Sequence, residues 1–304
     1  MVRYIAVLVL VYIGSKAFAT NACSGFSTLR QVNDTVKKDS ADSDTTDDDL
    51  NRMFAFGLEY ASDQTQYGLH NNVKIPYLEP NFTYTAPKGF YITLSEQYLL
   101  PKKVAGFDAF CLNPGWDIDF GDNTTLDFSY THYTFPSKSP NFIRSSLSNS
   151  LESFVEQWLG NLRGKFTIDY NIYKQKKTPN DIMFTPQLMY KFKWKLSEKT
   201  ALKFKPEVSV DFGTRNFYTE YLQAVQADSV SKNPKAKPKT IASNANSSFG
   251  TLDYNIALPL DFAICKFDLE PAFNYPHPLY TPSNLPNPPT AYFTFSVIYT
   301  ISTK

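Results

Sequence analysis

The chain of 304 residues carries 30 Lys and Arg against 29 Asp and Glu, so its formal net charge is only +1. This balance gives no electrostatic case for nucleic acid as a partner. The mean hydropathy of -0.32 resembles that of a soluble protein, but membrane strands that alternate lipid-facing and lumen-facing residues give a similar average. The aromatic fraction of 16% is the more informative feature.

The first 19 residues have the form of a secretory signal peptide. Arg3 precedes the apolar run 4–13, Gly14 breaks that run, and residues 17–19 supply the small residues that signal peptidase needs. The run is shorter than the roughly 20 apolar residues of a membrane-spanning helix. We therefore predict export and cleavage near residue 19; an uncleaved anchor and acylation of Cys23 are the alternatives.

Residues 20–52 are polar and contain an acidic stretch from Asp39 to Asp49. Like charges repel one another and stay solvated, so we predict a disordered tail in the periplasm. A calcium-binding loop is the alternative, but the glycine that an EF-hand needs for its turn is missing.

From residue 53 onward, apolar and polar residues alternate with a period of two, which is typical of β-strands. Phe54, Phe56 and Leu58, for example, alternate with Ala55 and Gly57. Soluble sandwiches alternate as well. However, the alternation continues for longer than the five or six residues usual in soluble strands in several segments (181–194, 200–213 and 250–265). It also continues past the 9 to 11 residues that a strand needs to cross a membrane. This length favours membrane strands.

The pattern predicts about twelve strands, near 53–61, 74–86, 89–100, 107–120, 124–136, 150–159, 162–174, 181–195, 200–213, 250–264, 266–275 and 290–302. Tight turns alternate with longer connections, as in outer-membrane barrels that have both termini in the periplasm. The segment 150–159 also fits an amphipathic helical turn. The Pro-rich segment 276–289 is predicted to be an extended outside loop, because Pro cannot continue a hydrogen-bonded ladder.

We therefore predict an all-β fold: one antiparallel transmembrane β-barrel of about twelve strands over residues 53–304. Charges on the lipid face cost a few kcal/mol near the midplane, so the charged phase of each strand is assigned to the lumen. The predicted lumen-lining residues are Asp117, Asp119, Asp127, Lys165, Asp169, Lys191, Lys193, Lys203, Lys205, Glu207, Asp211, Asp253, Asp261, Lys266, Asp268 and Glu270. Such mixed charges can pair and fill the lumen or line a narrow wet passage.

The sequence offers little catalytic chemistry. It shows no Gly-rich phosphate loop, metal-ligand cluster or zinc spacing, so we predict no cofactor, no metal and no enzyme activity. His132 lies among aromatic residues near a strand end and is interpreted as interfacial, with a catalytic base as the alternative. The odd count of three cysteines argues against a disulfide framework, and a Cys111–Cys265 bridge is the one pairing that stays open.

The closing strand 291–302 is aromatic on one face, although the chain ends in Lys304 rather than in an aromatic residue. Together with the signal peptide and the strands at 54–60 and 89–95, it resembles the uncharacterised outer-membrane β-barrel proteins of Bacteroidota over residues 53–304. The resemblance implies outer-membrane lipid, lipopolysaccharide and the barrel-assembly machinery as partners, and it implies no established active site.

For function, the first prediction is a structural barrel or a narrow passive channel for small solutes. The first alternative is a surface-binding barrel whose outside loops 214–249 and 276–289 hold a glycan or a protein partner. A lysine-rich run at 232–239 lies in the first of these loops. The second alternative is a barrel-embedded hydrolase.

Overall fold

The computed structural model describes residues 52–67, 69–70, 74–101, 105–136, 147–174, 179–217, 249–280 and 289–303. The predicted signal peptide and residues 20–51 of the predicted tail lie outside these residues, as does most of the loop 214–249; Arg52 begins the first strand. Within the described ranges, no helix has the length and apolar character needed to cross a membrane.

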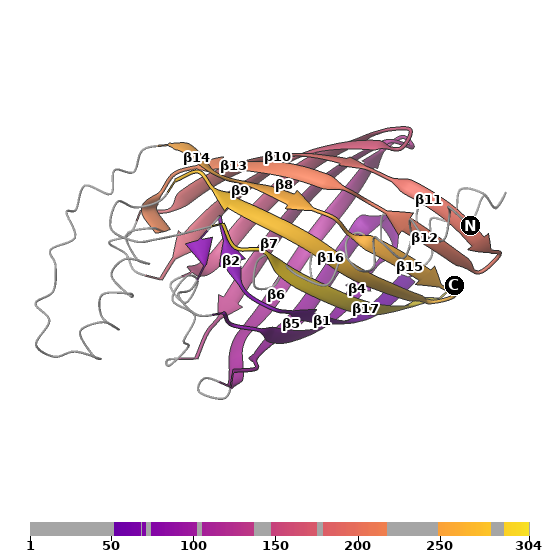
Figure 1. The fold of residues 1–304 in the computed structure, drawn as a ribbon, viewed down its shortest axis with the longest axis horizontal. Helices are drawn as coiled ribbons and strands as arrows, with labels where there is room; N and C mark the ends of the chain where they lie inside the picture. The colour runs from indigo at the N-terminus through magenta and orange to yellow at the C-terminus, as the bar shows by residue number, and fades with distance from the viewer. Residues whose placement is uncertain are drawn as a thin grey trace, which may run out of the picture.

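Strands make up most of the described chain (Figure 1). Their bounds are β1 (Arg52–Ala61), β2 (Thr65–Gln66), β3 (Leu69–His70), β4 (Tyr77–Thr85), β5 (Phe90–Leu99), β6 (Gly106–Phe120), β7 (Thr124–Thr134), β8 (Leu147–Leu159), β9 (Leu162–Tyr173), β10 (Asp181–Tyr190), β11 (Phe192–Ser197), β12 (Thr200–Phe204), β13 (Glu207–Gly213), β14 (Gly250–Ala257), β15 (Leu260–Ile264), β16 (Phe267–Pro278) and β17 (Tyr292–Thr303).

Three crossings of the barrel wall are each built from two consecutive strands: β10 continues as β11, β12 as β13, and β14 as β15. The wall therefore has twelve crossings, as predicted, and all neighbours are antiparallel. The ring closes because β17 pairs with both β1 and β16. Closure pairs the strands around the ring, apart from β11 and the last part of β16, so most backbone hydrogen bonds of the wall can be satisfied inside a bilayer.

The connections sort by length, which confirms the predicted alternation. Tight turns at residues 86–89, 121–123, 160–161, 198–199 and 265–266 lie at the end where β1 begins and β17 ends (Figure 1). Gly121 and Gly160 occupy these turns with φ of +66° and +62°, a conformation that glycine adopts without steric cost. We call this the tight-turn end and the opposite one the loop end.

Two local predictions are settled by the strand pairing. Residues 150–159 are strand rather than helix, because β8 pairs with β7 and β9 along its length. The proposed loop 276–289 begins too early, since β16 continues through Pro276 to Pro278 beside β14. The pairing of β16 with β17 stops at Asn274, so this part of β16 has one open edge, where proline is tolerated.

Exposure is inverted relative to a soluble protein. Trp116 and Phe56 are 53% and 48% exposed on the outside of the barrel, whereas Glu59 and Asp127 are 3% and 0% exposed within it. Soluble domains rarely bury Asp or Glu and seldom show large contiguous apolar surfaces. An apolar exterior around a polar interior is the arrangement that a lipid-embedded barrel requires.

Cys111 and Cys265, the two cysteines that the structure describes, are not joined to each other. Cys265 is a free, exposed thiol in the turn 265–266, whereas Cys111 is disulfide-bonded and fully buried in the middle part of β6. A disulfide needs Cα atoms within about 7 Å. The Cys111–Cys265 bridge that the sequence left open is therefore absent.

Candidate functional site: the barrel lumen

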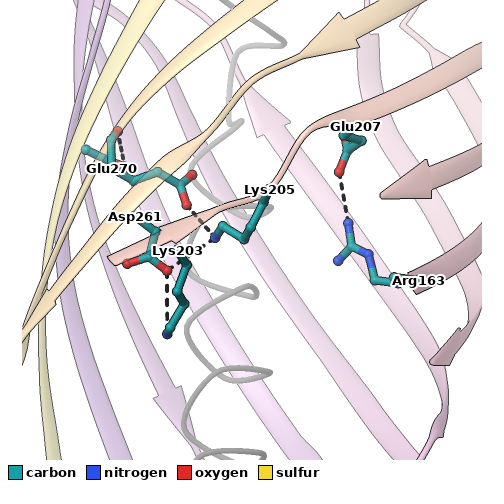
Figure 2. Close-up of polar contacts among 7 residues, drawn as sticks. Arg163, Lys203, Lys205, Glu207, Asp261 and Glu270 are labelled. Atoms are coloured by element: carbon teal, nitrogen blue, oxygen red, sulfur yellow. Dashed lines mark hydrogen bonds and ion pairs between the residues drawn. The ribbon is translucent and has the colours of Figure 1, made fainter. Parts of the chain in front are cut away.

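An ion-pair cluster on β12, β15 and β16 lies on the inner wall (Figure 2). Asp261 Oδ2 is 3.6 Å from Lys203 Nζ and 3.3 Å from Lys205 Nζ, and Lys205 Nζ also lies 2.6 Å from Glu270 Oε2. The strand register produces this cluster, because Lys203 and Asp261 are direct cross-strand partners on the inward face. Lys203 and Asp261 are 2% and 4% exposed, so the charges are largely withdrawn from water.

A second cluster centres on Arg163 of β9. Its guanidinium lies 3.3 Å from a carboxylate oxygen of Glu156 on β8 and 2.9 Å from one of Glu207 on β13 (Figure 2 shows the Glu207 contact). Trp158 Nε1 donates to the other Glu156 oxygen over 2.5 Å. Because Arg163 bridges carboxylates from two different strands, it fixes the wall and fills lumen space at this level.

Carboxylates alone gather toward the loop end. Asp211 and Asp253 are cross-strand partners on β13 and β14, and the Thr185 hydroxyl donates to Asp211. Asp169 lies opposite Glu152 on the neighbouring pair β9 and β8. These four acids define the acidic girdle: Glu152, Asp169, Asp211 and Asp253.

The lumen charge is therefore polarised along the barrel axis. The inward Lys and Arg of the described strands lie in the tight-turn half, interleaved with acids. Besides the acidic girdle, the cross-strand partners Glu59 and Glu79 are buried in the loop half. Below the mouth, where Arg215 lies, a cation entering from the loop end would meet strands whose described inward charges are negative.

The mouth at the loop end is covered by an aromatic and aliphatic cap, defined by the buried residues Leu147, Tyr173, Met183, Phe217 and Leu252 with Tyr67, Tyr133 and Tyr280 packed against them. Phe217 follows β13 and contacts Tyr67 with ring centroids 5.3 Å apart. Leu252 enters the cap because a register shift between Asp211 and Phe212 makes it a bulge residue on β14.

Asp181, at the start of β10, anchors the cap. Its carboxylate accepts from the backbone N–H groups of Asn216 and Phe217 over 2.9 and 2.8 Å, and from the hydroxyls of Tyr173 and Thr214 over 2.7 and 2.5 Å. Three of these four donors belong to residues 214–217, so the buried carboxylate holds that segment over the lumen.

Tyr67 closes the cap from the other side. Asn171 Nδ2 donates to its hydroxyl over 3.0 Å. Burial raises the pKa of Tyr67 well above its usual value, and the nearby Asp169 and Asp211 raise it further. The hydroxyl therefore stays neutral across the physiological pH range, and the cap gains no charge from it.

The sixteen predicted lumen residues differ in exposure. Those that are buried are Asp117, Asp127, Lys203, Lys205, Asp253 and Asp261; those that are half-buried are Lys165, Asp169, Lys191, Glu207, Asp211, Asp268 and Glu270; those that are exposed are Asp119, Lys193 and Lys266. Lys266 lies in the turn 265–266 rather than on the wall, because β16 begins one residue later than the alternation suggested.

Sequence reasoning missed several inward charges. Arg163 has the same strand phase as Lys165 and could have been found by extending that phase to the strand start. Glu152 and Glu156 are not among the predicted lumen-lining residues, because the segment 150–159 also fits a helical turn. Asp181 was missed because a carboxylate at the first position of a strand has no alternation that reveals its role.

His132 and His277 both lie on strands of the barrel wall. His132 of β7 is exposed, and its Nδ1 lies 2.9 Å from Asn149 Oδ1. His277 lies in β16 and stacks on Tyr254 with ring centroids 4.8 Å apart, so it belongs to the wall and not to the predicted loop. Among the residues that the structure describes, no group of three or more His, Cys, Asp or Glu is placed to hold a metal ion.

A closed antiparallel barrel with an apolar exterior, tight turns at one end and longer connections at the other is the architecture of outer-membrane β-barrel proteins. The chain is assigned to that class and to the outer membrane. No protein-family model and no curated protein matches the chain.

Solved structures of similar fold include the NanC porin, at 8% identity and a TM-score of 0.43, over 82% of this chain and 98% of that one. An outer-membrane channel from Pseudomonas putida F1 is 10% identical with a TM-score of 0.41, over 86% and 100%. The translocator domain of the autotransporter NalP from Neisseria meningitidis is 12% identical with a TM-score of 0.39, over 93% and 97%. At these values the likeness carries no argument about function, which must come from the lumen.

Proposed function

We propose that the protein is a narrow passive channel that favours small cations. The observation that carries this proposal is the polarised lumen: the acidic girdle lines the loop half, while Arg163, Lys203 and Lys205 are paired with acids in the tight-turn half. A passage lined by charge of one sign inside a low-dielectric wall focuses its field and raises the local concentration of the opposite ion. Rings of Asp and Glu select cations in other pores.

Ion selectivity in planar bilayers tests the proposal. We expect the purified mature barrel to give single-channel currents with a reversal potential that favours cations over anions in a salt gradient. Neutralising the girdle with Asp211→Asn and Asp253→Asn should reduce that preference, because it removes the negative charge that this carboxylate pair carries at one level of the lumen.

Reversing charge at Lys203 and Lys205 should shift the same potential in the opposite direction, toward stronger cation preference. The matched control is Lys266→Glu, which changes an exposed turn residue and should leave selectivity nearly unchanged. A folded, inserted barrel that conducts no ions, or one that favours anions, would contradict the proposal.

The cap makes a further prediction for the channel. Asp181→Ala should raise conductance, because it removes the acceptor for the three hydrogen bonds that hold residues 214–217 at the mouth. Hydrogen bonds to a charged group contribute roughly 1.5–3 kcal/mol each, so losing even one would raise the open population about tenfold. The adjacent Asn180→Ala is the control. Unchanged conductance in Asp181→Ala would show that the cap does not limit flow.

A surface-binding barrel is the second candidate. One contact favours it: the Arg215 guanidinium lies 3.8 Å over the Tyr280 ring and thereby brings the ends of two long loops together at the mouth. Deleting residues 218–248 and 281–288 from a barrel that still folds should then abolish binding of a surface glycan or protein partner while sparing conductance.

We also propose that the protein is related to the Bacteroidota barrels, that it contacts lipopolysaccharide, that the barrel-assembly machinery inserts it, and that it has no enzyme activity. The hydrolase alternative depends on His132. If the barrel shows lipase or protease activity and His132→Ala leaves that activity intact, His132 is not its catalytic base.

A further inference from the structure

A pair of carboxylates faces the lumen where β13 and β14 lie side by side. Asp211 and Asp253 are direct cross-strand partners, and their carboxyl groups are close enough to hydrogen-bond to each other. Like charges directly opposite each other on neighbouring strands destabilise a sheet. A bound ion of opposite charge would remove that cost.

Two oxygen atoms at this level of the wall are left unused by the protein. Asp253 is 3% exposed, yet its Oδ1 has no hydrogen-bond partner. Asn255, two residues further along the same face of β14, also has a buried Oδ1 without a partner. Buried polar atoms normally have partners, so these two oxygens are available to a ligand that enters the lumen.

The protein supplies no counter-charge to the pair. In the part of the chain that the structure describes, no Lys or Arg forms an ion pair with Asp211 or Asp253. Lys165 of β9 places its Nζ 4.0 Å over the ring of Phe154 on β8, whereas β13 lies on the other side of β9. Arg215 stacks on an aromatic ring at the mouth. The negative charge of the pair is therefore left for a cation from solution.

We propose that Asp211, Asp253 and Asn255 bind a hard divalent cation, for which Ca²⁺ is the best fit. Ca²⁺ takes about six to eight oxygen ligands from carboxylates, amide carbonyls and water. The two carboxylates offset its charge, and the Asn255 oxygen adds a neutral ligand. Softer metals prefer Cys and His, which this set lacks. The site differs from groups of three or more His, Cys, Asp or Glu, of which the described residues hold none.

This inference rests on the proposed function only for the route by which the cation reaches the site, and it names one ion that the acidic girdle holds. An ion conducts well only if it binds weakly enough to leave again. A divalent cation between two carboxylates is held more tightly than Na⁺, because its charge is twice as large. Ca²⁺ should therefore reduce the Na⁺ current through the barrel.

Titration calorimetry with CaCl₂ on the folded mature protein, in a zwitterionic detergent at neutral pH, measures binding without any ion flow. We expect one site with a dissociation constant of about 10⁻⁴ to 10⁻³ M, as in other weak calcium sites. Asp211→Asn combined with Asp253→Asn should weaken binding by about tenfold or more, because both charged ligands are lost. The matched control is Glu96→Gln with Asp119→Asn, which changes the same number of carboxylates at two exposed positions and should bind Ca²⁺ as the wild type does.

Variants of Asn255 keep the test decisive if the double variant fails to fold. Asn255→Asp adds a third carboxylate and should tighten Ca²⁺ binding, whereas Asn255→Leu should weaken it. Equal affinity in the wild type and both Asn255 variants would overturn the site, and so would a folded double variant that binds as tightly as the wild type. No binding at millimolar Ca²⁺ would also overturn it, and would mean that the two carboxyl groups share a proton instead.

Planar bilayers separate this site from the proposed channel. A barrel that binds Ca²⁺ but conducts no ions would contradict the channel and leave the site in place. A barrel that conducts Na⁺, but whose current Ca²⁺ leaves unchanged, would overturn the placement of the site in the path of the ions.

Discussion

Replacement of Ile168 by Lys is expected to destabilise the folded barrel by about 2–4 kcal/mol, the cost of Lys on the lipid face near the bilayer midplane. Ile168 is 38% exposed on the outer face in the middle of β9. The adjacent Thr167 points inward and shares its strand phase with Lys165 and Asp169. Thr167→Lys should therefore cost much less, although it introduces the same side chain one position away.

Reversible guanidinium unfolding in lipid vesicles, followed by tryptophan fluorescence, measures both free energies. The contrast between the two variants matters more than either value, because both change the charge of the chain equally. If Thr167→Lys proved as costly as Ile168→Lys, or more so, the assignment of inner and outer faces on β9 would be wrong.

Asp261→Asn is expected to cost about 3 kcal/mol of barrel stability, because removal of one partner from a buried ion pair leaves charge uncompensated. Asp261 is 4% exposed and lies within ion-pair distance of both Lys203 and Lys205. After the change, the cluster keeps Glu270 as the carboxylate that contacts Lys205. The amide is nearly isosteric with the carboxylate, so the loss would report charge rather than packing.

The matched control is Asp119→Asn. Asp119 is exposed near a tight turn and accepts a hydrogen bond from Thr125 over 2.9 Å. Exposed substitutions usually change stability by less than about 0.5 kcal/mol. Equal stabilities for the Asp261 and Asp119 variants would mean that water in the lumen screens the Lys203–Asp261–Lys205 cluster.

The strand count and the sorting of turns were predictable from the sequence because each crossing lies between two different media. Lipid on one side and charged lumen on the other impose a period of two over the full width of the membrane. That constraint made Phe166, Ile168 and Tyr170 recognisable as one face, and their exposures of 40%, 38% and 40% agree with it. The constraint acts on each strand separately, so single strands were sufficient to reveal it.

The charge contacts were not predictable, because they depend on which residues face each other across neighbouring strands. Lys203 meets Asp261 through a register between segments 58 residues apart. Nothing within either segment specifies that register. A one-residue slip would have turned one of the two side chains to the other face. Alternation therefore identified the phase of these residues and could not identify their partners.

Local departures from the ideal ladder were also hidden. The alternation predicts that Leu252 faces outward. A bulge instead points its side chain toward the cap, where it is 0% exposed. Pro276 and Pro278 were predicted to lie in a loop, but they belong to β16, where one open edge of the strand accommodates them. The cap itself depends on Asp181, whose four donors come from two separate parts of the chain and meet only in the fold.

The most direct test of the account is the migration of the native protein on gels, with and without heating, after isolation of the outer-membrane fraction. A closed, detergent-resistant barrel should stay in that fraction and change its apparent mass on boiling, because heating opens a sheet that detergent alone leaves intact. A mature chain that is recovered dissolved in the periplasm, monomeric without detergent and unaltered in mobility by heat, would contradict a barrel whose apolar side chains face lipid.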